Sequence, residues 1–171
     1  MRRLIIWAGL LGLPSVLGLP QSAPPSPYRH DPRLARLTAF FAACRCPVHS
    51  LAEDFLVAAD NHDLDWRLLP SISLVETGAG KHAPGNNLFG WDSGRRSFTS
   101  ARQAIHFVAS RLATSKLYRS KGLEAVLSTY NPNPGYAPLV KSVMRRLGPR
   151  ELPALEARLS PPVGLPLPAH Q

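Results

Sequence analysis

The sequence predicts a mainly α-helical domain that carries one small glycine-rich loop or hairpin lobe. Between residues 31 and 148, apolar side chains recur at helical spacing in several separate segments. Helix-start signals precede these segments, and turn-forming residues separate them. Glycine, proline and asparagine gather between residues 78 and 98, which interrupts the helical pattern there. A single helical domain with one lobe follows from these three observations.

The first three expected helices span residues 32–43, 51–62 and 66–77. Asp31 followed by a proline marks the start of the first helix, because proline is favoured at the first helical position. Ser50 and Glu53 have the spacing of a capping box for the second helix. Asp65 is expected to cap the third helix, and Gly78 is expected to end it.

Residues 79–98 form the predicted lobe, in which residues 88–91 and 97–98 can pair as a small hairpin. The remaining helices are expected at 101–112, capped by Ser100, at 122–130 and at 136–147. An Asn-Pro-Asn-Pro-Gly turn separates the last two helices. The chain shows no internal repeat, so one domain is expected.

Prolines crowd both ends of the chain, which indicates extended tails around a folded centre. Residues 1–18 have a positive start followed by a short apolar stretch, the pattern of a signal peptide cleaved after Gly18. The alternative is an uncleaved N-terminal membrane anchor. Residues 19–30 are interpreted as a linker, 31–148 as the domain and 149–171 as a C-terminal tail. Both interpretations of the N-terminus predict an exported protein of the periplasm or cell envelope.

The formal net charge of +9 predicts attraction to polyanions. Export argues against nucleic acid as the partner. The peptidoglycan of the bacterial cell wall, whose lactyl and peptide groups carry carboxylates, is an anionic polymer on the expected side of the membrane. A simpler alternative is that the basic side chains solvate helix surfaces. We expect a monomer.

Cys44 and Cys46 are the two cysteines of the chain, and one residue separates them. In an exported protein they can form a strained disulfide or remain free thiols. His49 adds a third candidate metal ligand, but no fourth ligand is evident nearby. No metal and no cofactor are therefore expected.

Glu76 is the candidate catalytic residue. Of the eleven acidic residues, it alone sits among apolar neighbours, in the last turn of its predicted helix. Burial and the partial negative charge of a helix C-terminus both raise a carboxyl pKa. A carboxyl group that keeps its proton near neutral pH is suited to act as a general acid. The alternative is an ordinary surface glutamate at a helix end.

Three segments, in this order and spacing, resemble the bacterial glucosaminidase family of autolysins and flagellar-type wall-opening enzymes within the lysozyme-like superfamily. They are residues 69–78, which include Glu-Thr-Gly, residues 86–91 with the sequence Asn-Asn-Leu-Phe-Gly-Trp, and residues 130–137 with the sequence Tyr-Asn-Pro-Asn-Pro-Gly-Tyr-Ala. The resemblance covers about residues 50–147. It implies a lysozyme-like fold with Glu76 as the catalytic acid.

The resemblance also implies the residues of the substrate groove. Tyr136 matches a tyrosine that reaches the active site in lytic transglycosylases, which implies a catalytic role for Tyr136 beside Glu76. Tyr130 is expected to pack against the helix that carries Glu76. Asn side chains can donate and accept hydrogen bonds with sugar hydroxyls, although an Asn pair is also common in turns. Trp91 is either a core residue or a platform for a sugar ring. The candidate substrate-binding residues are Asn86, Asn87, Phe89, Gly90, Trp91 and Tyr130.

The sequence departs from the family where many members carry a second acid. Asp92 is the only acidic residue of the lobe and therefore the candidate second acid, but its sequence, Asp-Ser-Gly, favours a structural role in a turn. Glu124 lies in a predicted helix. Without a second carboxylate, Glu76 would serve as acid and then base, with attack by the substrate's acetamide or by a sugar hydroxyl. We therefore expect a peptidoglycan hydrolase of the N-acetylglucosaminidase type; the alternatives are a lytic transglycosylase and an inactive wall-binding protein.

Overall fold

The computed structural model describes residues 26–152, and all structural statements refer to this part of the chain. It is mainly helical, as the sequence predicts. Six α-helices and two short 3-10 helices follow one another, and the described residues contain no strand. The elements are α1 (Pro32–Ala43), η1 (Pro47–Leu51), α2 (Ala52–Asp60), α3 (Leu68–Thr77), η2 (Pro84–Asn86), α4 (Ala101–Thr114), α5 (Leu123–Tyr130) and α6 (Tyr136–Leu147).

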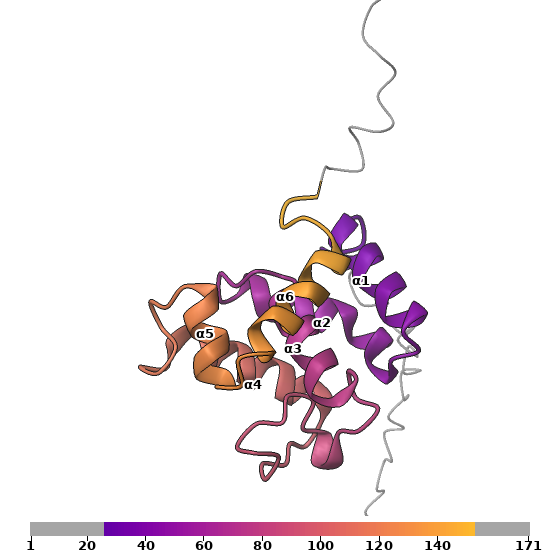
Figure 1. Ribbon diagram of the computed structural model, residues 1–171. Coiled ribbons are helices and arrows are strands. Elements are labelled where there is room, and N and C mark those ends of the chain that lie inside the picture. Colours follow the sequence, from indigo (N-terminus) through magenta and orange to yellow (C-terminus); the bar gives the residue numbers. More distant parts are fainter. Residues whose placement is uncertain (1–25, 153–171) are drawn as a thin grey trace, which may run out of the picture.

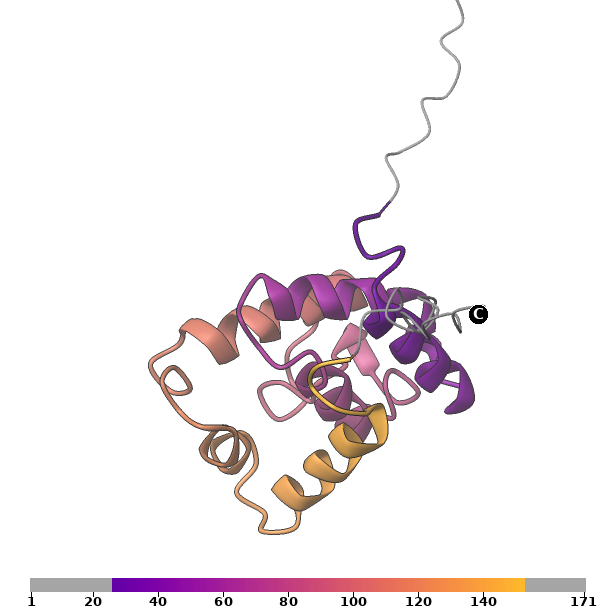
Figure 2. The ribbon, with the colours of Figure 1, turned by 90° about the horizontal axis from the view of Figure 1, so that it is seen from above.

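Helix α3 lies in the middle of the molecule, with the other helices around it (Figures 1 and 2). It packs against α6, while α2 packs against α1 and α4. Leu69 and Ile72 of α3 are fully buried, as are Phe41 of α1 and Phe55 of α2. The apolar faces of the helices thus enclose a single core, which holds the C-terminal end of α3 in place.

Two of the predicted helix starts are confirmed by hydrogen bonds. The Asp31 carboxylate accepts from the backbone N–H of Arg33 at 2.8 Å, and Pro32 is the first residue of α1. The Ser100 hydroxyl accepts from the N–H of Gln103 at 3.1 Å at the start of α4. Each bond satisfies an N–H group that has no partner within the helix.

The predicted capping box at Ser50 and Glu53 is wrong. Ser50 lies inside η1, which runs directly into α2, and no side chain caps α2. The predicted cap at Asp65 is also displaced from the helix. The Asp65 carboxylate accepts from the N–H of Arg67, but this bond closes a turn before α3, which begins at Leu68. The α3 C-terminus is confirmed at Gly78, which has a left-handed backbone with φ of +64°.

Of the two forms expected for the lobe, the loop is confirmed and the hairpin is not, because residues 79–98 contain only turns, η2 and irregular backbone. Two bonds close the lobe: Phe98 donates its N–H to the Gly85 carbonyl at 2.8 Å, and the Asn86 side chain donates to the Phe98 carbonyl at 3.0 Å. Left-handed residues follow one another closely here, including Asp92, Ser93 and Gly94, so the chain cannot extend into a strand.

Both ends of the described segment are held against the helical core. The Tyr28 hydroxyl donates to Asp60 at 2.9 Å, and the buried Trp66 donates its indole N–H to the Arg150 carbonyl at 2.8 Å. The packed unit therefore includes residues just outside the predicted 31–148. The predicted signal or anchor (1–18) and most of both tails lie outside the described residues. No helix in the described segment has the length and apolar character needed to span a membrane.

Candidate active site

Glu76 occupies the last turn of α3 and is half-buried. Burial raises the pKa of its carboxyl group, and a contact with the Tyr136 hydroxyl partly opposes this rise. No basic side chain of residues 26–152 forms an ion pair with Glu76. The carboxyl group is thus desolvated without a compensating cation, which favours its protonated form.

Thr77 connects the end of α3 to the lobe. Its hydroxyl lies 2.8 Å from the Leu88 carbonyl and 3.2 Å from the Ser73 carbonyl, and it accepts from the Gly80 N–H at 3.2 Å. The bond to the Leu88 carbonyl is buried, and it ties the lobe to the last turn of α3, which carries Glu76.

Gly90 is the residue of the lobe that comes closest to Glu76. A Cβ atom built at Gly90 would stand 2.8 Å from Glu76 Oε2, and Gly90 has a φ of +58°. Only glycine meets both conditions without strain, because it lacks Cβ and tolerates positive φ. Gly90, a candidate substrate-binding residue from the sequence, therefore lies directly against Glu76.

Asn87 and Phe89, by contrast, point into the protein. The Asn87 side chain is 2% exposed and makes two 2.9 Å hydrogen bonds, donating to the Trp91 carbonyl and accepting from the Trp91 N–H. The Phe89 ring is fully buried in the core. The prediction that these two side chains bind substrate is wrong, because both are buried and cannot reach it. They support the lobe from inside instead. Asn86 is exposed, but its amide also bonds within the lobe.

The two tyrosines of the third segment face Glu76 as a stacked pair. Their ring centroids are 6.0 Å apart and the planes are nearly parallel. The Tyr130 hydroxyl donates to the Phe89 carbonyl at 2.6 Å, so Tyr130 supports the lobe. The Tyr136 hydroxyl is buried and makes no hydrogen bond of standard geometry within the described residues. Burial, together with the nearby Glu76 charge, raises the pKa of both phenols, which therefore stay protonated.

Trp91 stands at the centre of an aromatic cluster. Its ring lies 5.7 Å from Phe107, 6.3 Å from Tyr118 and 5.9 Å from Tyr130, measured between centroids. It is partly exposed and borders a cavity of about 400 Å³ that Gly90, Tyr118 and Tyr130 also line. Trp91 is thus packed against the core and also forms part of the cavity wall, while its role as a platform for a sugar ring stays a prediction.

Two residues of this cavity were not predicted. Tyr118 is 7% exposed, and Arg96 lies across the Phe107 ring with its guanidinium carbon 4.0 Å from the centroid. Neither belongs to a recognisable motif, and both reach the cavity only because the lobe folds against α4. The preference of arginine for aromatic faces is a general signal, but it does not identify the partner ring.

Asp92 also lines the cavity, but its environment differs from that of Glu76. Its side chain is exposed and forms a 2.8 Å ion pair with Arg95. Glu124 of α5 is exposed and pairs with Lys141. His82 is exposed, and His106 of α4 lies 3.7 Å from Asp54 of α2. Glu76 is therefore the one half-buried, unpaired carboxyl group beside this cavity among the described residues.

Cys44 and Cys46 are free thiols in the structure. Cys46 is buried, which raises the pKa of its thiol. Within residues 26–152, no group of three histidine, cysteine or acidic side chains is arranged to hold a metal ion.

Fold and site together define a mainly helical protein with one half-buried, unpaired carboxylic acid near two tyrosines. This acid lies against Gly90, a residue that lines the neighbouring aromatic cavity. The chain matches no protein-family model and no curated protein. The resemblance to glucosaminidases therefore remains a prediction from the three segments.

Tyr136→Phe tests whether the Tyr136 hydroxyl lowers the pKa of Glu76. The Tyr136 hydroxyl lowers the pKa of Glu76 by stabilising its ionised form. Its removal is expected to raise that pKa further, so the alkaline limb of the pH–activity profile should move to higher pH. A profile of kcat/KM against pH measures this shift. Tyr118→Phe is the control, because Tyr118 does not contribute to the shift in the pKa of Glu76 and the variant keeps the aromatic ring of the cavity wall. An unmoved or acid-shifted limb in Tyr136→Phe would contradict the contact.

Proposed function

We propose that the protein cleaves glycosidic bonds in the glycan strands of peptidoglycan, in the manner of an N-acetylglucosaminidase, with Glu76 as general acid and then general base. The observation that carries the proposal is the half-buried, unpaired Glu76 carboxyl group, which lies against Gly90 in the wall of the aromatic cavity. Its raised pKa suits protonation of a glycosidic oxygen. The three segments that resemble glucosaminidases supply the substrate class.

In this mechanism, the protonated Glu76 donates its proton to the leaving oxygen as the bond to the anomeric carbon breaks. The carboxylate that remains then accepts a proton from the attacking water or hydroxyl group. The Tyr136 hydroxyl stabilises the carboxylate between these two steps, because it contacts the ionised form. The aromatic wall formed by Trp91 and Tyr118 offers apolar surface to a sugar ring.

A second candidate function is lytic transglycosylation, in which a hydroxyl group of the same sugar attacks the anomeric carbon. The observation that favours it is the state of Asp92, the other carboxylate of the cavity. Asp92 is exposed and paired with Arg95, so it is poorly placed to serve as the second carboxylate of a hydrolase. Both candidate functions use Glu76 alone as acid and base.

Mass analysis of the products released from purified peptidoglycan distinguishes these functions. Reducing N-acetylglucosamine ends would identify the glucosaminidase reaction, and anhydro-muramyl ends the transglycosylase reaction. If the protein binds the wall but releases no fragment, the enzymatic proposal fails and the protein is a wall-binding protein. The expected place of action is the cell envelope, outside the cytoplasm.

A further inference from the structure

The charge of the protein is divided unevenly along the chain. Residues 26–92 contain six basic and eight acidic side chains, whereas residues 93–150 contain eleven basic side chains and one acidic side chain, Glu124. The positive charge therefore belongs to the part of the chain that follows the Asn-Asn-Leu-Phe-Gly segment, which comprises α4, α5, α6 and their connections.

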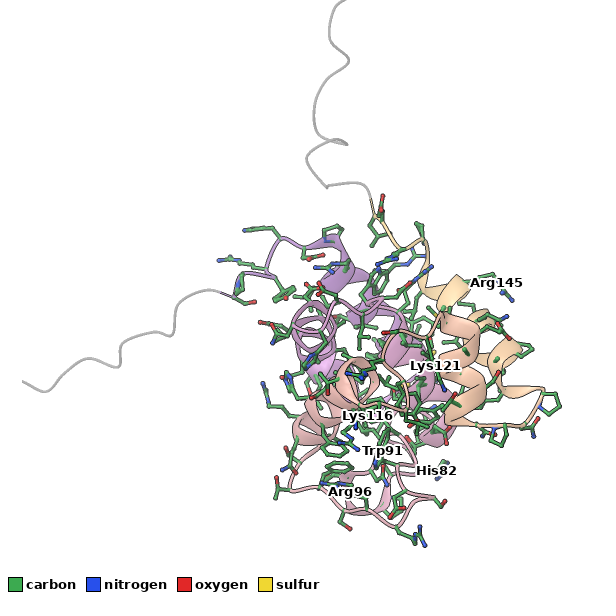
Figure 3. The ribbon with its side chains drawn as sticks, turned by 90° about the vertical axis from the view of Figure 1, so that its left-hand side faces the viewer. His82, Trp91, Arg96, Lys116, Lys121 and Arg145 are labelled. Carbon is green, nitrogen blue, oxygen red and sulfur yellow. The ribbon has the colours of Figure 1, made fainter. Side chains whose placement is uncertain are left out.

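A second cavity, of about 490 Å³, opens in this basic part of the chain. Arg111, Lys116 and Leu117 line it, together with Trp91 and Tyr118. Trp91 and Tyr118 also line the cavity beside Glu76, so these two aromatic residues form a wall common to both cavities. In Figure 3, Trp91 lies between Lys116 on one side and Arg96 on the other.

The two cations of the second cavity have no carboxylate partner within residues 26–152. Other basic residues of the same region do have one: Arg95 pairs with Asp92, Arg102 with Asp54 and Lys141 with Glu124. The charge of Arg111 also acts on the phenol of Tyr118, where it opposes the rise in pKa that burial causes. Arg111 thus lines the same cavity as Tyr118 and has no ion pair among the described residues, which leaves its guanidinium group available to an anion.

Peptidoglycan carries its anionic groups on peptide branches, which project from every second sugar of an otherwise uncharged glycan strand. A strand whose glycosidic bond lies at Glu76 would place such a branch to one side of the cleavage site. The second cavity combines cations for carboxylates with an exposed apolar residue, Leu117, for aliphatic side chains. A short acidic peptide presents the complementary groups, namely carboxylates and aliphatic side chains.

We propose that the cavity lined by Arg111, Lys116 and Leu117 binds the carboxylate-bearing peptide branch of the glycan strand, and so selects peptide-substituted strands as substrate. This inference rests on the proposed function for the position of the strand. The shared wall of Trp91 and Tyr118 separates the sugar at Glu76 from its peptide.

The test measures binding of a disaccharide–peptide fragment in two forms, one with free peptide carboxylates and one with these groups converted to carboxamides. Calorimetric titration uses the full chain with Glu76→Gln, which prevents turnover. We expect about tenfold tighter binding of the free-acid form at low salt, because two charge-assisted hydrogen bonds are lost on amidation. Adding Arg111→Gln and Lys116→Gln should remove the preference and leave the binding of the carboxamide form unchanged.

A charge-matched control adds Arg29→Gln and Arg145→Gln instead. Both residues are exposed and have no ion pair among the described residues, and Arg145 lies apart from Lys116 and Arg96 in Figure 3. This variant should keep the preference. Equal binding of both fragments by the parent, no binding of either, or the same loss in both double variants would overturn the proposal.

The experiments distinguish failure of the inference about the second cavity from failure of the proposed enzymatic function. If the protein with its native Glu76 cleaves glycan strands but shows no preference for free carboxylates, only the inference about the second cavity fails. If the binding preference is present and depends on Arg111 and Lys116 while no strand is cleaved, the peptide site stands and the enzymatic proposal fails.

Discussion

Replacing Glu76 by glutamine is expected to reduce the release of soluble fragments from peptidoglycan by roughly 10²–10⁴-fold, the usual contribution of general acid catalysis. The amide has nearly the shape of the carboxylic acid but cannot donate a proton to the glycosidic oxygen or accept one afterwards. Because Glu76 makes no ion pair within the described residues, the substitution breaks no salt bridge that holds the fold. Initial rates of fragment release, followed by chromatography and mass analysis, measure the effect.

Glu124→Gln is the matched control for this loss of activity. It removes the same charge from an exposed residue of α5 that pairs with Lys141, outside the cavity beside Glu76. It should retain the rate of the unmodified protein. A Glu76→Gln variant that still releases fragments at an undiminished rate would refute the role of Glu76.

The Glu76→Gln variant should also be more stable to unfolding than the unmodified protein at neutral and alkaline pH. Burial raises the pKa of Glu76 in the folded state above its value in the unfolded chain. Ionisation therefore favours the unfolded chain, and stability is lost as the pH rises through the raised pKa. Glutamine does not ionise, so the difference in free energy of unfolding should shrink toward acidic pH. Denaturant titrations at several pH values test this.

Gly90→Ala is expected to have the second large effect, because it places a methyl group against the proposed acid. The new Cβ would lie 2.8 Å from Glu76 Oε2, and the residue has a φ of +58°. The left-handed backbone alone should lower the free energy of unfolding by about 1–2 kcal/mol. The steric conflict should displace the carboxyl group in addition, so that activity falls by about 10²-fold, as for a misplacement of about 1 Å.

Gly94→Ala separates the two causes. Gly94 has a φ of +78°, but no other atom lies within 4 Å of the Cβ that alanine would add. This variant should lose a similar amount of stability and keep its activity. If both variants lose activity equally, strain in the lobe, and not contact with Glu76, controls the reaction.

The helices of this protein could be predicted largely from its sequence. Helical spacing of apolar residues and the local signals Asp31-Pro32, Ser100 and Gly78 depend on near neighbours in the chain, and the structure confirms them. The placement of Glu76 in the last turn of α3 is a local property of the same kind. Its half-buried state was predictable from its apolar neighbours.

The site itself depended on contacts between segments that are far apart in the chain. The sequence marks Asn87 and Phe89 as polar and apolar residues of one motif, but the fold turns both inward and brings Gly90 to Glu76 instead. Tyr118 and Arg96 carry no local signal and become cavity residues only when the lobe packs against α4. Helix ends are decided by neighbouring residues, whereas burial and the facing of side chains are decided by which surfaces meet, and only the tertiary structure determines that.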